Sequence, residues 1–214
     1  MDDREEVELR EIRRKREEHA KRRAENMWKT VNIGARFKDA SLDNFQNDEI
    51  RNRAKEYCDR FDQEEGSGLV LCGKYGTGKT HLAVAIAKTI AEKGNCVWFA
   101  TFAQMLQDLK AGFSSGLETE EMSKYKTVDL LVIDDLGKEK LTEWATEVLY
   151  TIIDTRYRNL KAVIITTNMM PNELNKRIDG AIMSRLAEMT EFVQFDGVDH
   201  RIENMKRRRT EWHG

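Results

Sequence analysis

Short apolar segments recur along the chain at the intervals of an alternating strand and helix fold. Each is a nearly continuous apolar run of four or five residues, the pattern of a strand buried on both faces. Helical segments separate these runs, so the pattern predicts an α/β domain with a five-stranded parallel sheet covered by helices. Ligands bind at the carboxyl ends of such strands. The predicted strands are residues 69–72, 96–100, 129–133, 162–166 and 191–195.

Three stretches between and before these strands have helical periodicity. In residues 47–62 the apolar side chains recur at spacings of three and four, and segments 102–110 and 180–189 also read as helices. Residues 28–45 instead carry aromatic side chains spaced by polar ones with no clear period. We expect this lead-in to be extended and to pack on the core.

The first 27 residues differ from the rest because 18 of them are charged. Opposite charges recur at helical spacing, as in Glu6–Arg10 and Glu18–Arg22, and this favours a helix. The apolar positions are too sparse to bury a stripe against a core. We therefore predict a solvated helical arm, and the alternative is an arm that becomes ordered on a partner.

Composition narrows the class of protein. Over 214 residues the formal net charge is −2, so any nucleic-acid binding must come from local patches. Three cysteines with no C-x-x-C pair exclude a disulfide framework and an ordinary zinc site, and they fit a reducing compartment. The charged N-terminus is unlike a signal peptide, and no apolar run approaches membrane-spanning length. We expect a soluble cytoplasmic protein with no membrane contact.

A phosphate-binding loop follows the first predicted strand. Residues 73–80 read G-x-x-x-x-G-K-T, between an apolar strand and a strong helix former. The glycines let backbone N–H groups face phosphate oxygens, and the helix N-terminus favours an anion. Lys79 is expected to reach the β- and γ-phosphates of ATP, and the Thr80 hydroxyl to ligate Mg²⁺. The candidate nucleotide-binding residues are Gly73, Tyr75, Gly76, Thr77, Gly78, Lys79, Thr80, His81 and, farther along the chain, Arg201.

Polar residues follow two further strands. Asp134 and Asp135 come directly after the third strand, which predicts that Asp134 holds Mg²⁺ and that Asp135 orients or deprotonates the attacking water. Asn168 follows the fourth strand, where its amide can hold that water beside the γ-phosphate. The alternative for Asn168 is a turn residue before Pro171. We assign Asp135 and Asn168 as candidate catalytic residues.

An arginine lies among apolar residues in the predicted helix 180–189. Ile182, Leu186 and Met189 are expected to face the core, with Arg185 off that stripe. One interpretation is a surface ion pair with Glu188 or Glu191, which contributes little. The other is an arginine finger that reaches the γ-phosphate bound to a neighbouring subunit. Arg177 is the competing candidate for that role.

The order of these motifs resembles one family of ATPases. The segments GKYGTGKTH, LLVIDDLG, ITTN, IMSRL and DGVDHR are similar to those of the DnaC/DnaI-type bacterial and phage helicase loaders, which are AAA+ ATPases related to the IstB transposition ATPases. The similarity covers residues from about 31 to 205. The resemblance implies subunits in a spiral or ring with ATP at each interface, Arg185 as the finger and Arg201 as a second sensor.

The same resemblance implies partners. In such loaders the ATPase ring grips single-stranded DNA, and the N-terminal region holds a DnaB-type hexameric helicase. Phe113, Thr142 and Trp144 are candidate DNA contacts, since aromatics near Lys110, Lys124 and Lys126 could stack on bases. Ordinary packing of Phe113 and Trp144 is the alternative. The basic run 206–209 could follow phosphates or end a solvated helix.

These observations predict a domain organisation and a function. We expect a charged arm (1–30) that docks the helicase, a lead-in and helix (31–66), and an AAA+ domain (67–214) with no separate lid. The leading hypothesis is a slow ATPase, stimulated by assembly or DNA, that loads a replicative helicase onto single-stranded DNA. The alternatives are a transposition-assisting ATPase acting on duplex DNA and a nucleotide-switched adaptor with little turnover.

Overall fold

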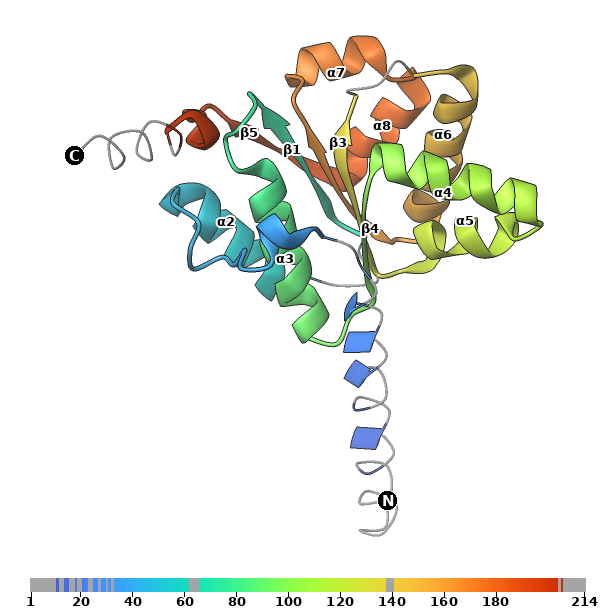
Figure 1. The fold of residues 1–214 in the computed structure, drawn as a ribbon, viewed down its shortest axis with the longest axis horizontal. Helices are drawn as coiled ribbons and strands as arrows, with labels where there is room; N and C mark the ends of the chain where they lie inside the picture. The colour runs from blue at the N-terminus through green and yellow to red at the C-terminus, as the bar shows by residue number, and fades with distance from the viewer. Residues whose placement is uncertain are drawn as a thin grey trace.

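The protein is built around one parallel β-sheet (Figure 1). The computed structural model describes residues 11, 14–15, 18, 21–22, 25–26, 28–29, 31, 33–61, 66–137, 141–203 and 205. Within them five strands form the sheet in the order β2-β3-β4-β1-β5, and every neighbouring pair is parallel. The prediction of a five-stranded parallel sheet is confirmed. The strands are β1 (Gly68–Gly73), β2 (Val97–Thr101), β3 (Leu130–Leu136), β4 (Ala162–Thr167) and β5 (Thr190–Phe195).

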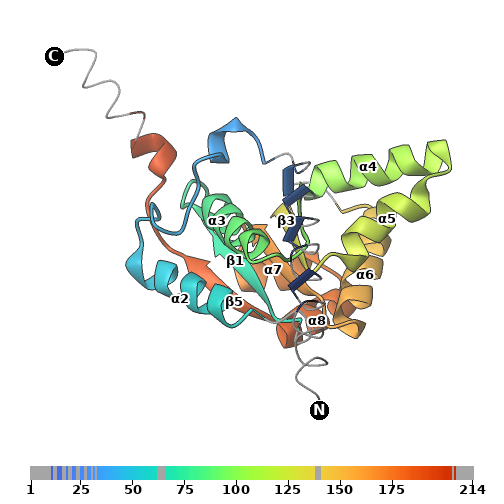
Figure 2. The same ribbon diagram turned by 90° about the horizontal axis from the view of Figure 1, so that it is seen from below.

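Helices cover both faces of this sheet (Figures 1 and 2). Alternate residues of a strand point to opposite faces, so Leu69 and Leu71 of β1 join one core while Val70 and Cys72 join the other. The first core is closed by α2 and α3, and the second by α4, α5, α6 and α8. The helical elements are η1 (Ala35–Phe37), α2 (Asp48–Asp59), α3 (Lys79–Glu92), α4 (Phe102–Ser115), α5 (Glu118–Thr127), α6 (Glu143–Arg158), α7 (Pro171–Arg177) and α8 (Gly180–Met189).

Side-chain caps define where several helices begin. Asn47 accepts a hydrogen bond from Ile50 N at the start of α2, and Thr101 and Asp179 do the same for α4 and α8. Helix α4 continues to Ser115, five residues beyond the predicted end at 110. The lead-in contributes directly to the core beneath α3, because Leu42 and Phe45 are buried there.

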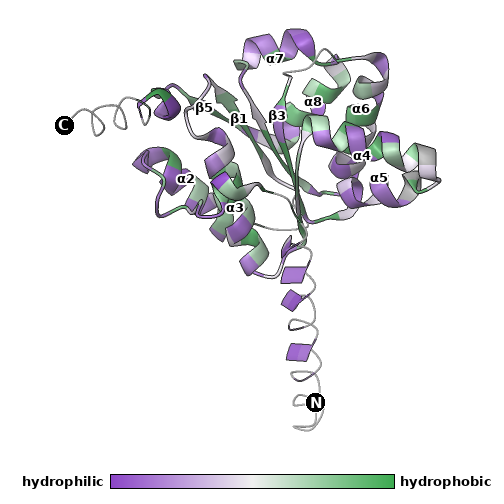
Figure 3. Cartoon of the chain, in the orientation of Figure 1, coloured by the Kyte–Doolittle hydropathy of each residue, from purple (hydrophilic) through white to green (hydrophobic). Residues whose placement is uncertain are grey.

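The described residues of the charged arm, from Glu11 to Lys29, are helical (Figure 1). Most of them are exposed and hydrophilic (Figure 3), whereas Trp28 packs against the core. Arg14 and Glu18 form an ion pair at 3.8 Å, four residues apart. The remaining arm residues and the basic run 206–209 lie outside the described residues. Over the described part of the chain, no helix is long and apolar enough to cross a membrane.

One charged side chain, Arg156, is completely buried at the amino-terminal edge of the sheet. Its guanidinium donates hydrogen bonds to four backbone carbonyls, none of them on its own helix. Nη1 donates to Tyr125 O at 3.0 Å, and Nη2 donates to Val128 O at 3.0 Å, to Asp129 O at 3.2 Å and to Ala162 O. Burial lowers its pKa to about 9. Arg156 thus ties α6 to the segments that enter β3 and β4.

Candidate functional site

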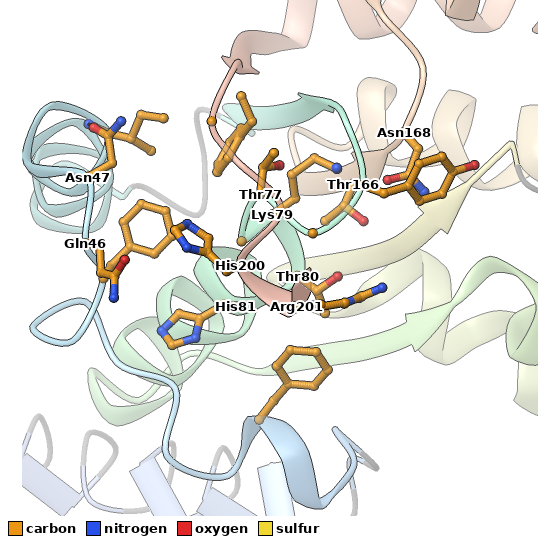
Figure 4. A pocket seen from close by; sticks show the side chains of 18 of the residues that line it. Gln46, Asn47, Thr77, Lys79, Thr80, His81, Thr166, Asn168, His200 and Arg201 are labelled. Atoms are coloured by element: carbon orange, nitrogen blue, oxygen red, sulfur yellow. The ribbon is translucent and has the colours of Figure 1, made fainter. Parts of the chain in front are cut away.

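A cavity of about 1090 Å³ opens at the carboxyl ends of β1, β3 and β4 (Figure 4). The lead-in, the phosphate loop and the segment after β5 form its walls. It brings together most of the residues that the sequence singled out. Those lining the cavity are Tyr75, Gly76, Thr77, Gly78, Lys79, Thr80, His81, Asp134, Asp135, Asn168 and Arg201.

The phosphate loop joins β1 to α3 in a conformation that requires glycine. Gly76 and Gly78 have φ angles of 74° and 97°, in the left-handed region that side chains disfavour. A Cβ on Gly76 would lie 1.9 Å from the Asp199 carboxylate, and one on Gly78 would lie 3.0 Å from the Phe45 ring. The loop is therefore held between the lead-in and the segment after β5. It ends at the N-terminus of α3, where free backbone N–H groups favour an anion.

Lys79 begins α3 and points back into the loop. Its Nζ donates to Gly73 O at 2.8 Å and to Lys74 O at 2.6 Å, and only 7% of the residue is exposed. Burial lowers the pKa of Lys79 to about 8, while the nearby carboxylates of Asp135 and Asp134 act in the opposite direction. Gly73 does not line the cavity and contributes this carbonyl instead.

We expect ATP affinity to fall as the pH rises above about 8. Phosphate oxygens favour the charged ammonium, so ATP binding raises the pKa of Lys79. At a pH where Lys79 of the free protein is partly deprotonated, ATP binding is therefore accompanied by the uptake of a proton. Affinity should be flat below the pKa and about 30-fold weaker at pH 9.5. Calorimetric titration with ATP in two buffers of different ionisation enthalpy measures both effects. Equal affinities at pH 7 and pH 9.5 would contradict this role of Lys79.

Two hydroxyls and one carboxylate form an oxygen cluster beside the loop. Thr80 Oγ1 donates to Asp134 Oδ1 at 2.8 Å, and Thr166 Oγ1 donates to the same oxygen at 2.6 Å. Burial raises the pKa of Asp134, and the hydrogen bonds from Thr166 and Thr80 lower it. Mg²⁺ prefers oxygen ligands, and it is usually bound by one or two protein side chains together with the phosphates of a nucleotide. Thr80 and Asp134, predicted as metal ligands, are thus adjacent.

The second acid of the pair lies in a strained part of β3. Asp135 has φ 60°, and the register between β3 and β4 shifts between Ile133 and Leu136. Its backbone N–H donates to Thr166 Oγ1 at 2.9 Å, and its carboxylate accepts from Asn168 Nδ2 at 2.8 Å. Residues other than glycine with a positive φ angle cluster at functional sites. Thr166, which the sequence reading left without a role, therefore positions both acids with one hydroxyl.

The other end of the cavity is formed by residues that the sequence did not identify. Phe45 of the lead-in packs 5.8 Å from the His81 ring, measured between ring centroids, and His81 Nε2 lies 2.7 Å from Asn44 Oδ1. Burial lowers the pKa of His81. Opposite, His200 N donates to Gly76 O at 3.1 Å. Further lining residues that sequence reasoning missed are Arg36, Phe37, Asn44, Phe45, Gln46, Asn47, Ile50, Thr166, Phe195, Asp196, Gly197, His200, Glu203 and Met205.

Arg185 and Arg177 do not line this cavity. Arg185 is on α8 and pairs with Asp154 of α6, at 2.9 Å from Nε to Oδ1. The predicted ion-pair partners, Glu188 and Glu191, are wrong. Glu188 accepts from Tyr157, and Glu191 pairs with Arg53 of α2. The reason is that α8 packs against α6, which places the Asp154 carboxylate of α6 beside Arg185.

The candidate DNA contacts lie on a separate face, formed by α4 and the start of α6. The rings of Phe113 and Trp144 meet edge to face at 6.4 Å, and Lys110 Nζ lies 4.9 Å from the Trp144 ring centroid. Thr142 caps α6 by accepting from Ala145 N at 3.2 Å. Lys124 lies over Trp98 instead. Phe113 remains 48% exposed, whereas Trp144 is partly buried and packs against the second core.

Comparison with known proteins finds similarity to ATP-binding proteins. The family described as IstB-like ATP binding protein matches residues 6–208. The replicative helicase loader DnaC of Escherichia coli K12 is 30% identical over 136 residues, which are 63% of this chain and 55% of that protein. A putative ATP-binding protein in an insertion sequence of Mycobacterium tuberculosis H37Rv is 29% identical over 143 residues, or 64% and 57% of the two chains.

The similarity extends to a solved structure. A crystal structure of the DnaC helicase loader matches with a TM-score of 0.72 and 33% identity, and the match covers 76% of this chain and 100% of that one. The chain spans little more than half the length of the curated relatives named above.

Proposed function

Because the chain belongs to the family of IstB-like ATP-binding proteins, we propose that it is an ATPase that loads a hexameric replicative helicase onto single-stranded DNA. The observation that carries the proposal is the match to the DnaC loader structure over the whole of that chain. The cavity supports it, since one site brings together the candidate groups for binding a nucleoside triphosphate and for activating the attacking water.

The hydrolytic steps follow from the contacts in the cavity. Backbone N–H groups of the loop and the Lys79 ammonium bind the phosphates, and Lys79 exchanges its bonds to Gly73 and Lys74 carbonyls for phosphate oxygens. Thr80 and Asp134 would hold Mg²⁺, which would neutralise charge on the phosphates. Asp135 accepts a proton from the attacking water, and Asn168 orients it. Arg201 lies at the same cavity and can bind phosphate from its own chain.

We propose that a neighbouring copy completes this site. Arg185 lies outside the cavity of its own chain, so its charge can assist hydrolysis only at another subunit's nucleotide. A spiral or ring with ATP at each interface provides that arrangement. Assembly on DNA then stimulates turnover, because a lone chain lacks the arginine.

The surface formed by Lys110, Phe113 and Trp144 is our candidate for binding single-stranded DNA. An exposed Phe113 beside Trp144 can stack on a base, and Lys110, which lies over the Trp144 ring, can contact the phosphate. We assign helicase docking to the charged arm, residues 1–30. Capture of the helicase by a chain lacking these residues would contradict that assignment.

The direct test combines a loading assay with ATPase measurements. The protein should capture a DnaB-type helicase, transfer it to a single-stranded circle in the presence of ATP, and hydrolyse ATP faster when helicase and single-stranded DNA are both added. No capture and no stimulation would overturn the loader function. A turnover that stays negligible under every condition, with capture intact, would indicate a nucleotide-switched adaptor instead.

We expect Trp144→Ala to weaken binding of single-stranded DNA about 10-fold or more, because a lost stacking platform costs roughly 1–3 kcal/mol per base. Fluorescence anisotropy with a labelled oligothymidine measures this affinity. The matched control is Trp98→Phe, at a tryptophan that also lies near a lysine but packs between the two core clusters. Equal affinity of the Trp144→Ala and wild-type proteins would exclude this surface.

A second function, assistance to transposition, is favoured by the family description and by the insertion-sequence relative. That function requires binding to duplex target DNA and does not require a helicase. Preference for duplex over single-stranded DNA, together with failure to capture helicase, would support it.

A further inference from the structure

Arg185 is held in one position by contacts with its own chain. Nε and Nη2 both donate to Asp154 Oδ1, at 2.9 Å and 2.8 Å. Nη2 also donates to the Tyr150 hydroxyl at 3.3 Å, and Nη1 donates to Ala181 O at 2.9 Å. One Nη1 hydrogen has no acceptor among the described residues. The side chain is 24% exposed, so it is not closed off from solvent.

Two tyrosines of α6 lie against this guanidinium. The ring centroids of Tyr150 and Tyr157 lie 5.0 Å and 5.8 Å from the Arg185 Cζ atom. The Tyr157 ring is anchored in turn, because its hydroxyl donates to Glu188 Oε2 at 2.9 Å. Cation–π contact at these distances favours the charged side chain in that orientation.

Asp154 is the group on which this arrangement depends. Its side chain is only 14% exposed and serves two arginines, with one oxygen for each. Oδ1 accepts from Arg185, while Oδ2 accepts from Arg158 Nη2 at 2.6 Å. Arg158 is 68% exposed, so it balances charge at the surface without restraining Arg185. The carboxylate therefore leaves one oxygen dedicated to Arg185.

We infer that Asp154 is a positioning residue for ATP hydrolysis, which holds Arg185 in one place for the γ-phosphate of a neighbouring copy. This inference rests on the proposed function, in which Arg185 acts across a subunit interface. An arginine that is already immobilised loses little rotamer freedom when it contacts phosphate, and its planar fork is pre-organised. A small misplacement of such a group can cost about 10²-fold in rate.

The test measures turnover of the full chain assembled with helicase and single-stranded DNA. Asp154→Ala should lower kcat about 100-fold with KM for ATP unchanged, because the residue does not touch the nucleotide cavity. Asp154→Asn keeps an acceptor for Arg185 and should recover most of the loss. The control is Arg158→Ala, which removes the other partner of Asp154 and should retain wild-type turnover. A wild-type or raised kcat in Asp154→Ala would overturn the inference.

A double-mutant cycle separates positioning from a general structural effect. In an Arg185→Ala background, Asp154→Ala should cause no further loss of kcat, since the partner through which it acts is gone. An added loss there would overturn the inference, even with the fold intact. If Arg185→Ala is inactive while Asp154→Ala is fully active, positioning fails and the proposed function stands. If Arg185→Ala itself is fully active, the interface role of Arg185 and the positioning role both fail.

Discussion

Replacing Arg185 by alanine should lower the ATPase rate of the assembled protein about 10³-fold or more, the loss typical of a missing arginine finger. ATP affinity of the isolated chain should stay unchanged, because Arg185 does not line the nucleotide cavity. The physical reason is that negative charge develops on the γ-phosphate in the transition state. Without Arg185 no cation compensates this charge, so the chemical step slows while ATP binding is unaffected. Steady-state ATPase assays with helicase and single-stranded DNA, alongside nucleotide titration, measure the two effects.

Arg177→Ala is the matched control for this prediction, since Arg177 ends α7 and also lies outside the cavity. It should retain turnover within a few-fold of the wild type. The reverse pattern, with Arg177→Ala inactive and Arg185→Ala active, would transfer the role to Arg177. Full activity of both variants would remove the argument for a shared site.

Replacing Arg156 by methionine should destabilise the fold by about 3–5 kcal/mol, because several buried polar groups lose their hydrogen-bond donor at once. Methionine fills much of the volume but leaves four backbone carbonyls without their donor. The melting temperature should fall by roughly 10 °C or more for a domain of this size. Arg156→Lys keeps a charge without the fork of donors, and should recover only part of the loss.

The control for Arg156 is Arg158→Ala, on the same helix two residues along. Arg158 is 68% exposed and forms a surface pair with Asp154, so its loss should cost less than about 1 kcal/mol. Thermal and urea unfolding followed by circular dichroism compare the variants. An Arg156→Met protein that melts with the wild type would show that the buried guanidinium contributes nothing to stability.

The fold could be predicted largely from the sequence because buried parallel strands are continuous apolar runs. Each predicted strand lies within two residues of the observed one except at the end of β3. There the strand runs on through Asp134 and Asp135 to Leu136. The apolar pattern predicted that this strand ends at residue 133, just before the charged Asp134. The structure keeps these acids in the strand because Thr166 on β4 bonds to both of them.

The phosphate end of the site was also predictable, because its motifs are local segments placed at strand ends. The remaining residues were not, since their roles arise from contacts between distant segments. Asp199 meets Gly76 and Phe45 meets Gly78 across gaps that no local pattern encodes. Nothing in the sequence distinguishes Arg156 from other charged residues of its helix. Asp154 lies 31 positions from Arg185, the arginine that it holds. The sequence order of motifs indicated an incomplete site but not how its arginine is kept in place.

The central claim is that two copies of the chain share each active site. Asp135→Asn should bind ATP without hydrolysing it, and Arg185→Ala should do the same for a different reason. The two inactive variants are mixed in equal amounts and co-assembled with helicase and single-stranded DNA. About a quarter of the interfaces then combine an intact Asp135 from one copy with an intact Arg185 from its neighbour. The account predicts that ATPase activity returns to about a quarter of the wild-type rate. A co-assembled mixture as inactive as either variant alone would contradict it.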